Sequence, residues 1–125
     1  MAGNSWQQPV AGEPSCGTPH RKYNLALDVD PASTAVQTLD LSALVPVGTK
    51  AVAVMLVMQS TIAGDYLRIC DSGNTEIYGY ALAQVANVYE GGYCIAPVDS
   101  NRYIYWVINN ARVVVARIYL QYYFI

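Results

Sequence analysis

The chain has 125 residues, of which 54% are hydrophobic and 13% are charged, and its formal net charge is −2. This length suits a single domain of about 100–150 residues, and the apolar content argues against an intrinsically disordered chain. The few basic residues are scattered apart from Arg21 and Lys22, so no basic stripe for nucleic-acid phosphates is predicted.

The first residues lack a basic region followed by an apolar run, so no signal peptide is expected. The most apolar stretch, residues 51–58, is far too short to cross a bilayer as a helix, so no membrane partner is expected either. Cys16, Cys70 and Cys94 lack metal-type spacing. They are expected to be free thiols in a protein made in a reducing cytoplasm.

Residues 1–22 are expected to form an extended N-terminal arm. Pro9, Pro14 and Pro19 alternate with glycines there, and no hydrophobic periodicity is present. Trp6 is the large aromatic side chain of this arm. Such a side chain either docks on a partner or folds back on its own domain, and the residues alone favour neither.

A period of two begins at residue 23 and predicts a half-buried strand over residues 23–29. Asp30-Pro31 ends it, and a second strand is predicted over 36–41, before a turn at Pro46 and Gly48. Residues 51–58 are apolar on both faces, which is typical of a strand buried on both sides. One face then meets the core, and the other suits a contact between subunits.

Further strands are predicted over residues 66–70, 76–81, 83–89, 93–98, 102–107 and 112–124. Turn residues separate them, and no helix of normal length is evident. We therefore expect an all-β fold, an antiparallel β-sandwich spanning residues 23–125, with the extended N-terminal arm before it.

Few residues point to catalysis. The single histidine, His20, lies with Cys16 in the expected arm, which cannot hold a reactive pair in place. Asp28, Asp30 and residues 71–76 offer oxygen ligands, but aspartate is also an ordinary turn residue. We expect no enzyme activity, catalytic residue, metal site or cofactor.

Tyrosine is abundant, with 11 copies. Tyr103, Tyr105 and Trp106 lie together in one predicted strand and are candidate partner contacts, because such side chains suit interfaces and stacking on sugars. Packing within the sheet is the alternative role for most of the tyrosines.

Two segments, residues 40–57 and 98–124, resemble small β-sandwich modules of tailed bacteriophages, such as head decoration (cement) proteins and tail-fibre tip domains. The first contains Asp40-Leu-Ser followed by Val45-Pro and a core strand. The second contains Val98-Asp-Ser-Asn-Arg-Tyr and a terminal strand, although Gln121 stands where a glycine is common. The resemblance implies a jelly-roll-like fold, a homotrimer and a terminal arm that grips the capsid.

Two functions follow as expectations. In the first, the chain is a virion structural protein that decorates a phage head, with the major capsid protein or another virion protein as partner and Trp6, Arg21 and Lys22 as contacts. In the second, it is a receptor-binding tip module, in which Tyr103, Tyr105 or Trp106 stacks on a carbohydrate.

Overall fold

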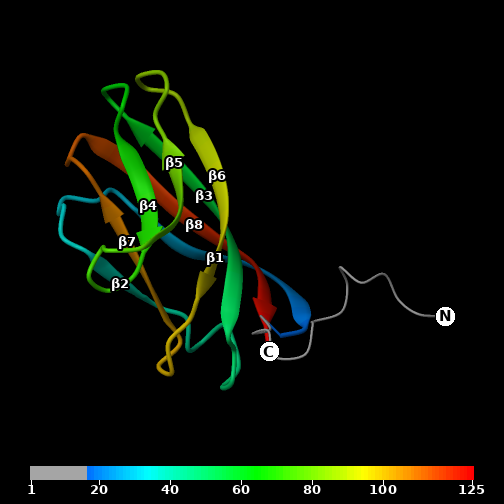
Figure 1. Cartoon of the computed structure of the whole chain (residues 1–125). Helices are drawn as coiled ribbons and strands as arrows, with labels where there is room; N and C mark the ends of the chain where they lie inside the picture. Colours follow the sequence, from blue (N-terminus) through cyan, green and yellow to red (C-terminus); the bar gives the residue numbers. More distant parts are fainter. Residues whose placement is uncertain (1–16) are drawn as a thin grey trace, which may run out of the picture.

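A computed structural model describes residues 17–125 of the chain. These residues form two four-stranded antiparallel sheets that face each other (Figure 1). In spatial order, sheet A contains β1 (Pro19–Val29), β8 (Val113–Phe124), β3 (Ala51–Ser60) and β6 (Glu90–Pro97), and sheet B contains β2 (Gln37–Asp40), β7 (Tyr103–Ile108), β4 (Tyr66–Cys70) and β5 (Ile77–Leu82). Within these residues there is no helix long and apolar enough to span a membrane.

The strand order is that of a jelly roll. Apart from the β4–β5 hairpin, every connection passes from one sheet to the other, which gives the orders 1-8-3-6 and 2-7-4-5. Eight strands wound in this way form the double-sheet architecture with two Greek keys. The predicted all-β sandwich with a jelly-roll-like fold is therefore confirmed.

Two sequence-based boundaries need correction. Residues 83–89, predicted as a strand, form a loop in which Asn87 adopts a positive φ of 62°. Strand β1 begins at Pro19 rather than at residue 23, because the long strand β8 offers partners up to Phe124. Arg21 and Lys22 therefore belong to the sheet and not to the arm, while Trp6 and Cys16 lie outside the described residues.

The core lies between the sheets and follows the two-residue period of the strands. In β3 the even-numbered side chains from Val52 to Met58 are buried, while the odd-numbered ones are half-buried on the other face. Ile69 and Ile104 of sheet B are likewise fully buried. One apolar face of β3 thus packs in the core, and the other lies on the outer side of sheet A.

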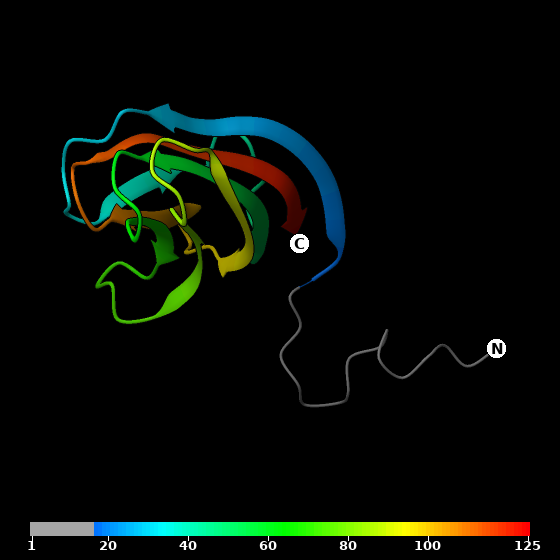
Figure 2. The ribbon, with the colours of Figure 1, turned by 90° about the horizontal axis from the view of Figure 1, so that it is seen from above.

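The sandwich closes where β5 and β6 meet, at the side where the two layers come together in Figure 2. Two glycines make this approach possible. A Cβ atom on Gly79 would lie 2.2 Å from the Cβ atom of Cys94, and one on Gly92 would lie 2.2 Å from the carbonyl oxygen of Tyr80. Any larger residue at either position would push the two sheet edges apart.

Candidate interaction surface

The outer face of sheet A carries an apolar row that crosses all four strands. The pairing register places Leu25 of β1 opposite Tyr119 of β8, Tyr119 opposite Met55 of β3, and Met55 opposite Tyr93 of β6. Paired residues on antiparallel strands project on the same face. Four residues that are far apart in the sequence therefore form one continuous row.

Several of the side chains on this face are unusually exposed for their type. Tyr93 is 72% exposed, Tyr23 61%, Ile95 54% and Leu25 51%. Single exposed apolar residues are common on protein surfaces, but a contiguous group of them marks an interaction site. We call the group formed by Leu25, Tyr119, Met55, Tyr93, Ile95 and Tyr23 the apolar face of sheet A.

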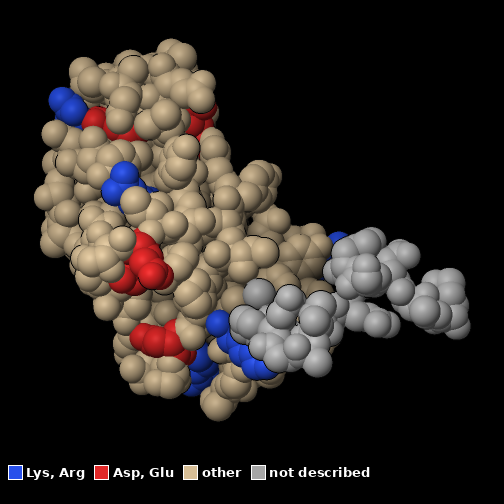
Figure 3. Space-filling model, viewed as in Figure 1, with Lys and Arg blue, Asp and Glu red and all other residues tan. Residues whose placement is uncertain are grey.

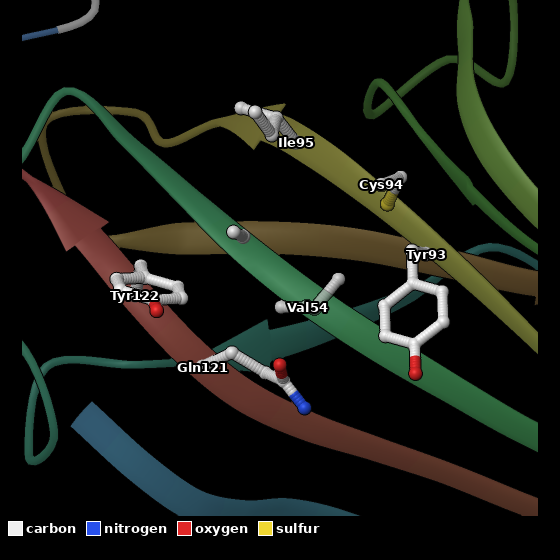
Figure 4. Close-up of a pocket in the computed structure, with 7 residues that line it drawn as sticks. Val54, Tyr93, Cys94, Ile95, Gln121 and Tyr122 are labelled. Atoms are coloured by element: carbon white, nitrogen blue, oxygen red, sulfur yellow. The ribbon is translucent and has the colours of Figure 1, made fainter. Parts of the chain in front are cut away.

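A hollow of about 280 Å³ lies at one end of this face. The neighbouring row places Ala53 of β3 between Ile95 of β6 and Tyr122 of β8, so a short side chain is flanked by two long ones. Figure 4 shows Tyr93 and Ile95 on β6 and Tyr122 on β8, on the two sides of β3. The hollow is large enough to receive a side chain from another protein.

Charge on the apolar face is sparse. Arg117 of β8 donates from Nε to Oδ1 of Asp28 on β1 at 3.1 Å, and its guanidinium lies 5.4 Å from the ring centre of Tyr89. Strand β3 carries no charged residue at all. The charges of Arg117 and Asp28 therefore neutralise each other, while Arg21 adds a positive charge at the edge of the face.

Arg21, a predicted contact residue, lies at the edge of the same face. Its Nη2 atom donates to the hydroxyl oxygen of Tyr122 at 3.3 Å, and its guanidinium lies 5.2 Å from the ring centre of Tyr23. The hydrogen bond and the positive charge lower the pKa of Tyr122. Lys22, its neighbour in β1, is half-buried.

The other predicted contacts lie on β7 in sheet B and are not brought together with Arg21 and Lys22. Tyr103 and Tyr105 line a groove of about 260 Å³ with Tyr78 and the carboxylates of Asp71 and Asp99. The hydroxyl of Tyr105 donates to Oδ2 of Asp99 at 2.8 Å, which raises the pKa of that tyrosine. The groove is therefore lined by both aromatic rings and hydrogen-bond acceptors.

Trp106 does not share that groove. Its indole is only 6% exposed and packs in the core, because alternate residues of β7 face the opposite sheet. Its Nε1 atom is buried without a hydrogen-bond partner among the described residues. Burial removes the ring face that stacking on a sugar would need, so Trp106 is not placed to act as a stacking platform.

Comparisons with protein-family models, curated proteins and solved structures find no match.

The side chains considered for catalysis or metal binding instead pack or form hydrogen bonds within the fold. His20 stacks on Tyr123 with 5.0 Å between ring centres. Burial raises the pKa of the Cys94 thiol to about 11 and also raises that of Cys70, and both thiols are free. Asp71 accepts hydrogen bonds from the backbone N–H groups of Thr75 and Glu76, so it organises a turn. Among residues 17–125 no group of three potential ligands could hold a metal ion.

Charged side chains are also sparse on the opposite side of the molecule. In the view of Figure 3, Lys, Arg, Asp and Glu occupy a small part of the surface, and most of it is uncharged. A phosphate backbone is normally bound by a basic stripe. The expectation that nucleic acid is not a partner stays a prediction.

Sequence reasoning anticipated the outward face of β3 but not the residues that complete it. Tyr93 and Ile95 alternate with inward-facing neighbours in β6, and Leu25 does so in β1. That alternation shows which side chains share a face of one strand. It does not show that β1 and β6 flank β8 and β3, because strand order comes from long-range pairing.

Proposed function

We propose that this chain is a virion structural protein, a decoration or cement protein that binds the outside of a bacteriophage head. One observation carries the proposal: the apolar face of sheet A crosses four strands, and four of its six side chains are more than half exposed, namely those of Tyr93, Tyr23, Ile95 and Leu25. Exposing such a face to water is unfavourable for an isolated protein, so the face suits a permanent contact with another protein. The sequence resemblance to phage modules is the reason why we propose a phage particle as the assembly that the chain contacts.

The mechanism of such a protein is passive. A decoration protein that binds the assembled shell and not its separated subunits stabilises the shell by mass action. No reactive group is needed, only a rigid surface that matches the shell. The jelly roll supplies that rigidity, because both sheets pack on one core that contains residues such as Leu56 and Ile118.

Co-sedimentation with phage heads tests the proposal. The chain should sediment with purified heads of the phage that encodes it, and the heads should withstand higher temperature when it is bound. Met55→Arg should weaken sedimentation at least tenfold, because it buries a charge in the middle of the contact. A chain that is missing from purified virions and leaves heads unaffected would rule out the proposal.

The groove beside Tyr103 favours a second candidate function, that of a carbohydrate-binding tip module. Tyr103, Tyr105 and Tyr78 offer rings for stacking, and Asp71 and Asp99 offer acceptors for sugar hydroxyls. Titration with host surface polysaccharide, comparing the natural chain with Tyr103→Ala, tests this reading. Equal signals from the two proteins would exclude the groove as the binding site.

A further inference from the structure

Strand pairing brings two turns together at one end of sheet B. Tyr105 of β7 lies opposite Cys70 of β4, and because the strands are antiparallel, the turn that follows β4 meets the turn that precedes β7. The first turn supplies Asp71 to the groove beside Tyr103, and the second supplies Asp99. At about 260 Å³ the groove lies just below the usual range of about 300–1,000 Å³ for ligand pockets, so it suits one small ring.

Each of the two carboxylates in this groove has one acceptor position left. A carboxylate offers about four lone-pair positions. Oδ1 of Asp99 accepts from the backbone N–H groups of Asn101 and Tyr103 at 2.9 and 3.0 Å. Its Oδ2 accepts from the hydroxyl of Tyr105 at 2.8 Å. Oδ1 of Asp71 likewise accepts from two backbone N–H groups, and its Oδ2 accepts from one hydroxyl. These bonds hold each carboxylate in place and leave its Oδ2 able to accept once more.

The groove carries negative charge that no cation inside it neutralises. The hydrogen bond from Thr75 lowers the pKa of Asp71. Burial opposes the ionisation of Asp99, but its hydrogen bonds lower the pKa overall. The lining residues include no Lys, Arg or His, and neither carboxylate belongs to an ion pair within the described part of the chain. Glu76 adds a further carboxylate, 3.4 Å from the hydroxyl oxygen of Tyr78.

Basic residues lie near the groove without lining it. Arg68 of β4 turns away from the groove, and its guanidinium lies 4.0 Å from the ring centre of Tyr66 at the other end of that strand. Arg102 donates to two backbone carbonyl groups and lines, with Lys50, a neighbouring hollow that shares Asp99 with the groove. Positive charge therefore lies beyond Asp99, and the part of the groove at the turn after β4 is the more negative part.

Aromatic rings complete a site for a cation. Tyr78, Tyr103 and Tyr105 line the groove and are half-buried, so part of each ring is open to a ligand. A cation over the face of a tyrosine ring is attracted by the electrons of the ring. The acceptor positions left on the carboxylates suit a primary ammonium group, which donates three hydrogen bonds. The apolar faces of the rings suit a flat ligand such as a sugar ring.

We infer that the groove beside Tyr103 binds an amino sugar, with its protonated amino group at Asp71 and its ring against the tyrosines. In taking the groove as a carbohydrate site we rely on the second candidate function, and the positive charge of the sugar is the new element. A neutral sugar leaves the charge of the groove unpaired, and an acidic sugar is repelled by it. The apolar face of sheet A is not involved, so binding to a phage head is unaffected.

Calorimetric titration of the full chain with two matched oligosaccharides tests the inference. The probes are tetraglucosamine, whose amino groups are protonated at pH 5.5, and tetra-N-acetylglucosamine, which is neutral. We expect tetraglucosamine to bind about fivefold more tightly or better. Tyr103→Ala, which removes a ring, and Asp71→Asn, which removes a charge, should each weaken its binding by about fivefold or more.

Two matched variants should bind as the natural chain does. Tyr103→Phe keeps the ring, and Asp30→Asn removes an exposed charge outside the groove. Circular dichroism shows whether each variant is folded. Tyr103→Ala keeps the turn at Asp99, because Tyr103 contacts that carboxylate through its backbone N–H, so it tests the groove even if Asp71→Asn unfolds.

Equal affinity for the two oligosaccharides overturns the inference and leaves the groove as a carbohydrate site. An equal loss from Asp30→Asn and Asp71→Asn also overturns it, because binding then reflects only the net charge of −2. Binding of tetralysine without binding of tetraglucosamine assigns the groove to a lysine side chain of a protein instead. If neither oligosaccharide binds, the inference falls, while titration with host polysaccharide still decides the second candidate function.

Discussion

Arg112 donates two hydrogen bonds to the buried carboxylate of Asp65, from Nη2 to Oδ1 at 2.8 Å and from Nε to Oδ2 at 3.2 Å. Ser60 and Asn109 donate to the same carboxylate at 2.6 and 2.9 Å. The hydrogen bonds from Arg112 are the largest cause that holds the pKa of Asp65 at about 2, below its ordinary 3.8. The carboxylate thereby ties the β3–β4 connection to the β7–β8 connection.

Stability should therefore fall as the solution becomes acidic. Because the pKa of Asp65 is lower in the folded state, its contribution is complete above about pH 4 and is lost as the pH falls through about 2. Arg112 is 46% exposed, so screening limits this contribution to at most about 2 kcal/mol. Asp65→Asn should lower the free energy of unfolding at pH 7 and flatten its dependence on pH between 4 and 2, as measured by urea titration at several pH values.

Asp28→Asn is the matched control for that experiment. Its ion pair with Arg117 is exposed, with 49% and 32% of the two side chains accessible, and exposed pairs contribute little to stability because water and salt screen them. If Asp28→Asn lowered the free energy of unfolding as much as Asp65→Asn, the buried network around Asp65 would contribute no more to stability than the exposed pair.

The close approach of β5 and β6 makes Gly79 intolerant of any side chain. Gly79→Ala should destabilise the domain by about 3 kcal/mol, since the added methyl meets the Cβ atom of Cys94, which the backbone holds in place. Gly73→Ala is the control, because its methyl meets only Thr75 at an ordinary 3.7 Å. Thermal unfolding of both variants distinguishes them, and equal melting temperatures would show that the two edges separate easily.

The thiols of Cys70 and Cys94 should be slow to react. In a Cys16→Ser background, Cys70 and Cys94 are expected to react with Ellman's reagent at pH 8 much more slowly in the native protein than in urea, because burial raises the pKa of both thiols and limits access. Rapid reaction of one thiol in native protein would indicate that the β5–β6 side opens readily.

Two N-terminal truncations should differ sharply in their effect on the stability of the fold. Removal of residues 1–16 should leave the fold intact, because the backbone pairing of Thr18 with Ile125 lies beyond the cut. Removal of residues 1–22 also deletes the first four residues of β1 and their partners' hydrogen bonds on β8, so it should lower the melting temperature by several degrees. If the arm grips the capsid, the shorter truncation should still fold but bind heads weakly; unchanged binding would exclude that role for it.

The fold class could be predicted from the sequence, whereas only the part of the candidate interaction surface on β3 could. The alternation in residues 23–29 and the continuous apolar run of residues 51–58 identified two strands, because both signals are local. The start of β1 at Pro19 was missed because prolines and glycines dominate its flank, and pairing with β8 overrides that local signal. Trp106 is a predicted partner contact next to Tyr105 in the sequence, but its position in the alternation of β7 places it in the core.

The position of β8 also governs when the protein can fold. It is the eighth strand, yet it lies between β1 and β3, and it pairs Tyr119 with Leu25 from the opposite end of the domain. Until its residues leave the ribosome, sheet A lacks a central strand and β1 has no partner. Pairing over such a sequence separation makes folding slow. The unpaired apolar strands are open to aggregation throughout synthesis, so cooler and slower expression is expected to raise the yield of folded protein.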